Sequence, residues 1–255
     1  MNKLFIDSIS PFAPKYYKNL NPKGFKIFTF NSGFKKKNDD LLVVIFDEVV
    51  NVACKYSLTS MPSAPIIWDK NNNKGFCKAV IVNSGNANAH TGKKGIKNIN
   101  KYVSELAKFL SCSKKKILVS STGVIGEHLD PNLICKKIKL LQTSKEKTLN
   151  DAAKSIITTD TFIKTSIKNL KIHSNNIKIY GFAKGSGMIN PNMGTMLAYI
   201  FIDCEIGSKI LKKLLSDNLE ETFNSISVDS DTSTSDTIMI FSNPLKKINI
   251  KSNYK

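Results

Sequence analysis

Short apolar segments alternate with polar ones along the whole chain. Each apolar segment is rich in Val, Ile, Phe or Tyr and is bounded by polar or glycine-containing residues, a pattern typical of β-strands. The pattern predicts strands over Leu41–Phe46, Cys77–Val82, Lys116–Ser120, Ile177–Phe182, Met196–Ile202 and Thr237–Phe241.

Helical periodicity appears between these strands, with apolar residues at steps of three and four. It is clearest over Gly95–Leu110 and recurs over Asn132–Leu141 and Ile206–Ile226. Helices and strands therefore alternate without a repeat period, which predicts an α/β or α+β fold.

Two polar loops adjoin predicted strands, where functional sites are commonly built. Asn83–Gly92 (NSGNANAHTG) follows one strand, and Lys184–Asn192 precedes another. The first loop does not fit the phosphate-binding pattern GxxxxGK[ST], because Gly85 and Gly92 are seven residues apart and Lys93 is followed by another lysine. A structural turn is the better interpretation of most of that loop.

The composition is that of a globular protein with a sizeable core: 255 residues, 41% of them hydrophobic and 23% charged. The formal net charge of +18 comes mainly from lysines in scattered runs such as Lys35–Lys37 and Lys114–Lys116. No aromatic residues interleave these runs as a base-stacking surface would require. We therefore attribute the charge to biased composition on the surface and expect no nucleic-acid partner.

The cysteines and histidines predict no metal site. The five cysteines are isolated and the three histidines show no zinc-ligand spacing. Isolated cysteines are usually reduced packing residues, which points to the cytoplasm. Neither a signal-peptide pattern nor an apolar run of about 18 residues is present, so no membrane partner is expected.

Thr195 is a candidate nucleophile. It opens the apolar run Met196–Ile202 directly after Gly194. A threonine that becomes a chain N-terminus has its own α-amino group, with a pKa near ~7.7–8.0, as the base. This would require cleavage of the Gly194–Thr195 bond. From the local pattern alone, a β-branched strand residue remains the better interpretation.

A second candidate element is Ser121–Gly126 (STGVIG), which follows a predicted strand. Backbone N–H groups at a Thr-Gly turn can form an oxyanion hole, because glycine lets the chain approach a ligand closely.

Five motifs together resemble the ornithine acetyltransferase (glutamate N-acetyltransferase) family of arginine biosynthesis. They are NSGNANAHTG, STGVIG, TTDTFIKT, KGSGMINPNMGTMLAYIF and SVDSDTSTSDT, in family order and at family-like spacing over nearly the whole chain. Members of that family are made as one precursor that cuts itself before a threonine to give an α and a β chain.

The resemblance implies a role for several residues of this sequence. The nucleophile would be Thr195 and the cleaved bond Gly194–Thr195, dividing the chain into an α-like region 1–194 and a β-like region 195–255. The oxyanion hole would be Thr122 and Gly123. The substrate contacts would be Thr158, Lys184 and Thr195.

The resemblance also implies an activity and a fold. The reaction would be acetyl transfer from N2-acetyl-L-ornithine to L-glutamate by a ping-pong mechanism through an acetyl-threonine. It needs no cofactor, and acetyl-CoA is an additional donor for some members. The fold would be a layered α/β sandwich of the N-terminal-nucleophile-like type, and two αβ pairs would form a heterotetramer.

The end of the chain departs from that family. Family β chains continue well past the DTSTSDT segment, whereas this sequence stops at Lys255, so part of the substrate pocket is expected to be missing. Two alternatives to an active acetyltransferase stay open. One is an N-terminal-nucleophile amidase or aminopeptidase that passes the acyl group to water; the other is an inactive remnant.

Overall fold

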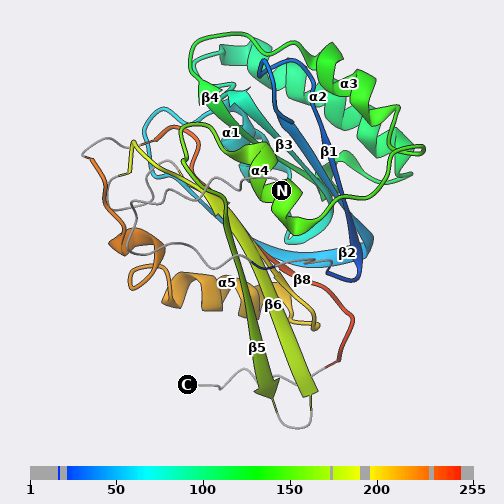
Figure 1. The fold of residues 1–255 in the computed structure, drawn as a ribbon, viewed down its shortest axis with the longest axis vertical. Coiled ribbons are helices and arrows are strands. Elements are labelled where there is room, and N and C mark those ends of the chain that lie inside the picture. Colours follow the sequence, from blue (N-terminus) through cyan, green and yellow to red (C-terminus); the bar gives the residue numbers. More distant parts are fainter. Residues whose placement is uncertain (1–16, 18–21, 173–174, 190–195, 230–232, 248–255) are drawn as a thin grey trace.

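A single twisted sheet of eight strands runs through the molecule, as Figure 1 shows. The structure is a computed structural model, and it describes residues 17, 22–172, 175–189, 196–229 and 233–247. The strand order is β4-β3-β2-β8-β7-β6-β5, and β1 pairs with β2 beside this path. The strands are β1 (Phe25–Phe30), β2 (Leu41–Tyr56), β3 (Phe76–Asn86), β4 (Ile117–Val124), β5 (Lys164–Ile172), β6 (Asn175–Lys184), β7 (Leu197–Ile202) and β8 (Thr237–Ser242).

The long strand β2 joins the two halves of the sheet. Its first part pairs with β1 and β3, its last part pairs with β8, and its register with β3 shifts between Ile45 and Val50. The pairs β3–β4 and β7–β8 are parallel, and the other pairs are antiparallel. Because β7 and β8 lie between β2 and β6, the region after residue 195 completes the same sheet as the region before it. The division at 194/195 stays a prediction about the chain.

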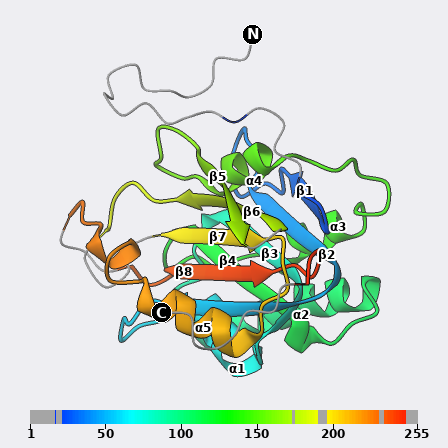
Figure 2. The ribbon, with the colours of Figure 1, turned by 90° about the horizontal axis from the view of Figure 1, so that it is seen from below.

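Helices cover both faces of the sheet, so the predicted layered α/β sandwich is confirmed. Figure 2 shows α4 on one side and α1, α2 and α5 on the other. Under α4, its residues Leu149, Ala153 and Ile156 pack with a cluster of aromatic side chains that includes Phe182 and Phe201. The helices are α1 (Ala64–Asn72), α2 (Gly92–Phe109), α3 (Pro131–Ile138), α4 (Leu149–Ile156) and α5 (Ser208–Asp217), with short 3-10 turns at Lys114–Lys116 and Phe223–Ser225.

The six predicted strands are all present, and two of the three predicted helices lie close to their predicted positions. The helix predicted over Ile206–Ile226 is too long, because α5 ends at Asp217. Beyond it, the Asn218 amide group donates to the Leu214 carbonyl and the Thr222 hydroxyl donates to the Asn218 carbonyl. Such side-chain bonds to the backbone favour turns over a continued helix.

All five cysteines are free, in keeping with their prediction as packing residues. Burial raises the pKa of Cys54 to about 12, so this thiol stays protonated. None of the helices in the described part of the chain is long and apolar enough to cross a membrane.

Candidate active site

The predicted oxyanion-hole residues lie at the carboxyl end of β4. There the parallel ladder sets Thr122 beside Ser84 and Gly123 beside Gly85 of β3. Gly123 has a φ of 130°, and a Cβ atom there would lie 2.3 Å from the carbonyl carbon of Gly85. The glycine is therefore required for the close approach of β3 and β4. Its role in an oxyanion hole stays a prediction.

Lys184 ends β6 and points its side chain at Thr122. Its Nζ donates a hydrogen bond of 3.1 Å to the Thr122 hydroxyl, and only 2% of the residue is exposed. No carboxylate in the described part of the chain forms an ion pair with it. Burial lowers the pKa of Lys184, because a buried ammonium loses its hydration. The structure thus brings together two predicted site residues that are 62 positions apart.

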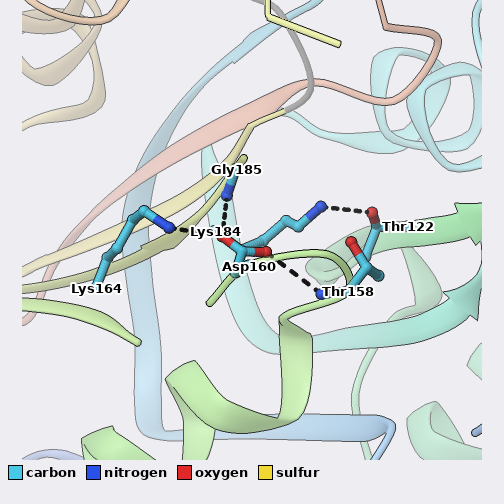
Figure 3. A network of polar contacts seen from close by, with 6 residues as sticks. All are labelled: Thr122, Thr158, Asp160, Lys164, Lys184 and Gly185. Carbon is cyan, nitrogen blue, oxygen red and sulfur yellow. Dashed lines mark hydrogen bonds and ion pairs between the residues drawn. The ribbon is translucent and has the colours of Figure 1, made fainter. Parts of the chain in front are cut away.

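Asp160 connects Thr158, another predicted substrate contact, to Gly185, the residue that follows Lys184 (Figure 3). Its Oδ2 accepts a hydrogen bond from the Thr158 backbone N–H at 3.3 Å. Its Oδ1 accepts from the Gly185 N–H at 2.8 Å and from the Lys164 Nζ at 2.7 Å. The Thr158 residue itself is exposed.

Gly194 and Thr195 lie outside the described residues, but the residue bonded to Thr195 is described. The backbone N–H of Met196 donates to Oδ1 of Asp236 at 2.7 Å. Asp236 is fully buried, and no described residue donates a hydrogen bond to its Oδ2. Burial raises the pKa of Asp236 to about 7, against the opposing effects of the Met196 amide and the Lys184 ammonium.

Sequence reasoning missed three residues of this region. Asp160 and Asp236 stand inside the TTDT and TSTSDT motifs, which are the signal that could have found them. The prediction that the lysine run Lys35–Lys37 lies on the surface is wrong for Lys35. It is half-buried, and its Nζ donates to the carbonyls of Ser155 and Ile157 at 3.0 and 3.2 Å, which ties the β1–β2 loop to the end of α4.

The sequence profile of the ArgJ family matches residues 26–255. The chain belongs to this family. Among curated relatives, it is 42% identical over 238 residues to the arginine biosynthesis bifunctional protein ArgJ of Rhizobium meliloti (strain 1021), and 42% identical over 221 residues to that of Bartonella henselae. The match with the first covers 92% of this chain and 58% of the relative, so the chain spans little more than half the length of the curated relatives it matches.

Two solved structures of the family share the fold. The Bacillus halodurans ArgJ protein has a TM-score of 0.62 and 31% identity, covering 69% of this chain and 92% of that one. The ornithine acetyltransferase of Mycobacterium tuberculosis, solved with ornithine, has a TM-score of 0.59 and 26% identity, covering 69% and 94%. In the described part of the present chain, no cluster of three or more His, Cys, Asp or Glu side chains could hold a metal ion.

Proposed function

We propose that this chain takes part in glutamate N-acetyltransferase chemistry in arginine biosynthesis, moving an acetyl group from N2-acetyl-L-ornithine to L-glutamate. The proposed nucleophile is Thr195. The proposed oxyanion hole is Thr122 with Gly123, and the proposed substrate contacts are Thr158, Lys184 and Thr195. Family membership supports this reaction class, and the Mycobacterium relative is named an ornithine acetyltransferase and was solved with ornithine.

The observation that carries the proposal is the buried ammonium of Lys184. A buried charge is normally paired, because leaving water costs several kcal/mol unless a partner compensates. Here the Thr122 hydroxyl is the one hydrogen-bond partner of Nζ in the described part of the chain. A ligand carboxylate beside Nζ would complete the site. Acetylornithine and glutamate both carry an α-carboxylate, so one cation can hold the donor and the acceptor in turn.

The proposed reaction has two halves. In the first, the Thr195 hydroxyl oxygen attacks the acetyl carbonyl, the amide C–N bond breaks, and ornithine leaves with the hydroxyl proton on its amine. In the second, the amine of glutamate attacks the acetyl-threonine ester, the ester C–O bond breaks, and Thr195 regains its proton. The Thr122–Gly123 turn would bind the oxyanion of both tetrahedral intermediates. None of these steps calls for a metal ion or prosthetic group.

The Thr195 amine that would act as base requires prior cleavage of Gly194–Thr195. The Bacillus structure supports a divided chain: 69% of the present chain covers 92% of that one, so the solved chain is shorter than this one. A separate α chain would have this property. We propose that two αβ pairs then associate, a state that sedimentation of the purified protein would test.

An intact-mass spectrum of the purified chain tests the cleavage. We expect two species, one ending at Gly194 and one beginning at Thr195, while Thr195→Ala gives one uncut chain of 28.3 kDa. Thr195→Ser is the matched control, because it keeps a hydroxyl nucleophile and should still cut. A single species in the wild type would contradict cleavage by this chain and favour an inactive remnant.

A product assay tests the acceptor. With acetylornithine and glutamate, we expect N-acetylglutamate to form and the Thr195 fragment to carry one acetyl group when glutamate is withheld. Release of free acetate at a rate that glutamate does not change would instead indicate an amidase. Replacing acetylornithine by acetyl-CoA in the same assay tests the second donor.

A further inference from the structure

Asp160 accepts three hydrogen bonds beside the candidate site. Its carboxylate is fully buried and accepts hydrogen bonds from three different segments: the Thr158 loop, the Lys164 side chain of β5 and the Gly185 amide after β6. None of the roles proposed so far uses it. A buried carboxylate with this many donors is held rigidly, because each donor fixes one direction at an oxygen.

The two amides that Asp160 holds lie at or next to two of the three proposed substrate contacts. One amide belongs to Thr158 itself, and the other belongs to Gly185, which is bonded to Lys184. Thr158 and Lys184 come from different parts of the chain, and one carboxylate sets the spacing of their backbones (Figure 3). Sites that recognise small ligands depend on such support, since small misplacements of the contact residues weaken binding.

We propose that Asp160 is a positioning residue, whose single carboxylate fixes the Thr158 loop against the end of β6, next to Lys184. The substrate-binding part of this inference rests on the proposed function. The structural part does not, because it concerns only residues of this chain.

The charged groups around Lys184 predict the direction in which its pKa changes in each variant. Three charged groups act on Lys184: Asp160 before β5, Lys164 on β5 and Asp236 before β8. Lys35 in the β1–β2 loop also faces it, and the Lys184 ammonium lowers the pKa of Lys35. Burial lowers the pKa of Lys184, Asp160 and Asp236 raise it, and Lys164 lowers it. Removing the charge of Asp160 should therefore lower the pKa of Lys184, and removing that of Lys164 should raise it.

The primary variant is Asp160→Asn, which keeps the shape of the side chain. An amide has only one oxygen, so its NH2 group must face either the Thr158 N–H or the Gly185 and Lys164 donors. Lys164→Gln removes one charge and leaves both backbone amides bonded. Asp151→Asn is the matched control, because Asp151 caps the other end of α4 through the Thr148 amide and hydroxyl and has no bond to the site.

The experiment titrates the lysine side chains of the full chain by NMR and measures the affinity for ornithine and for glutamate by calorimetry. We expect Asp160→Asn to lower the pKa of Lys184. It should also weaken the binding of ornithine and of glutamate about tenfold at pH 8, because one net hydrogen bond and the alignment of the contact residues are lost. Lys164→Gln should raise the pKa of Lys184. Asp151→Asn should lower only the melting temperature.

The outcomes separate the two proposals. If Lys184 in Asp160→Asn titrates as in the wild type, or shifts equally in Asp151→Asn, Asp160 has no positioning role and the inference is overturned. If the expected titration shifts occur but the wild type binds neither amino acid, the role of Asp160 within the chain stands and the proposed function fails. If Asp160→Asn does not fold, Lys164→Gln takes its place in the test. A rise in the pKa of Lys184 in Lys164→Gln supports the inference, and an unchanged pKa contradicts it.

Discussion

The two carboxylates that flank Lys184 are held in opposite ways. Asp160, before β5, accepts three hydrogen bonds, and those from Lys164 and Gly185 outweigh the effect of burial and hold its pKa below the usual range. Asp236, before β8, accepts one from Met196 on Oδ1, and burial raises its pKa to about 7 against the opposing effects of Met196, the Ser233 hydroxyl and the Lys184 ammonium. Both residues are buried, so burial alone does not decide the charge of a carboxylate. The hydrogen-bond donors and the charges around the carboxylate decide it together with burial.

Replacing Lys184, the cation on which both carboxylates act, should have the largest effect on ligand binding. We expect Lys184→Met to weaken the binding of glutamate and ornithine at least about 100-fold, because a buried partner for a carboxylate is lost. The variant should fold, since Met fills a similar volume and no ion pair is broken. It should also raise the pKa of Asp236, which the ammonium holds down. Calorimetry measures the first effect and NMR titration of Asp236 the second.

Lys178→Met is the control for that variant, because Lys178 is an exposed lysine of the same strand. It should bind both amino acids as the wild type does. Unchanged affinity in Lys184→Met would remove the ammonium from the proposed site.

Asp236→Asn should change the pH dependence of stability. The pKa of Asp236 rises from 3.8 to about 7 in the folded state, so its contribution is fully present below about pH 4 and is lost as the pH rises to 7. From pH 4 to 8, the wild type should therefore lose up to about 4 kcal/mol of unfolding free energy relative to Asp236→Asn. Urea denaturation at several pH values measures this. If the difference in unfolding free energy between the wild type and Asp236→Asn did not vary with pH, the pKa of Asp236 would not be raised by folding.

Asp160→Asn should change the pH dependence of stability in the opposite direction to Asp236→Asn. The folded pKa of Asp160 is lowered, so its contribution is present above the unfolded pKa and is lost as the pH falls through the folded pKa. At pH 7 the wild type should be more stable than the variant by about 1–3 kcal/mol, the cost of leaving buried donors unmatched. The same denaturation series measures it. If the difference in unfolding free energy between the wild type and Asp160→Asn grew as the pH fell, the two carboxylates would not differ as described.

Lys164→Gln should have the smallest effect on stability. The Lys164 side chain is 33% exposed, and its ion pair with Asp160 is partly screened by solvent. We expect a loss of about 0.5 kcal/mol in unfolding free energy that shrinks in high salt. Thermal denaturation at two salt concentrations measures it. A salt-independent loss as large as that of Asp160→Asn would mean that Lys164, and not the two amides, holds the carboxylate.

Of the elements that the sequence pattern did not predict, β5 and α4 carry weak or short periodic signals. Strand β5 (KTSIKNLKI) is largely exposed, and it is a strand because nine of its residues pair in register with β6. Charged residues on an edge strand of this kind hide its apolar alternation. Helix α4 has eight residues, too few for a clear period, although the Thr148–Asp151 capping box before it was a readable start signal.

The candidate site was predicted one segment at a time. Motif resemblance singled out Thr122, Thr158 and Lys184, and the structure joins all three through the Lys184–Thr122 bond and through Asp160. No periodicity in the sequence could predict that contact, because it depends on the order in which β4 and β6 enter the sheet. Thr195 stays a prediction from resemblance, since it lies outside the described residues.

The sequence by itself determined six of the eight strands, the class of the fold, the family and the segments that form the site. These depend on residues that are near one another in the chain, through side-chain periodicity and local turn chemistry. Only the tertiary structure decided that Lys184 is a buried cation and that the pKa values of Asp160 and Asp236 shift in opposite directions. Those properties depend on burial and on donors supplied by distant segments, because the charge of a group is set by the dielectric and hydrogen bonds around it.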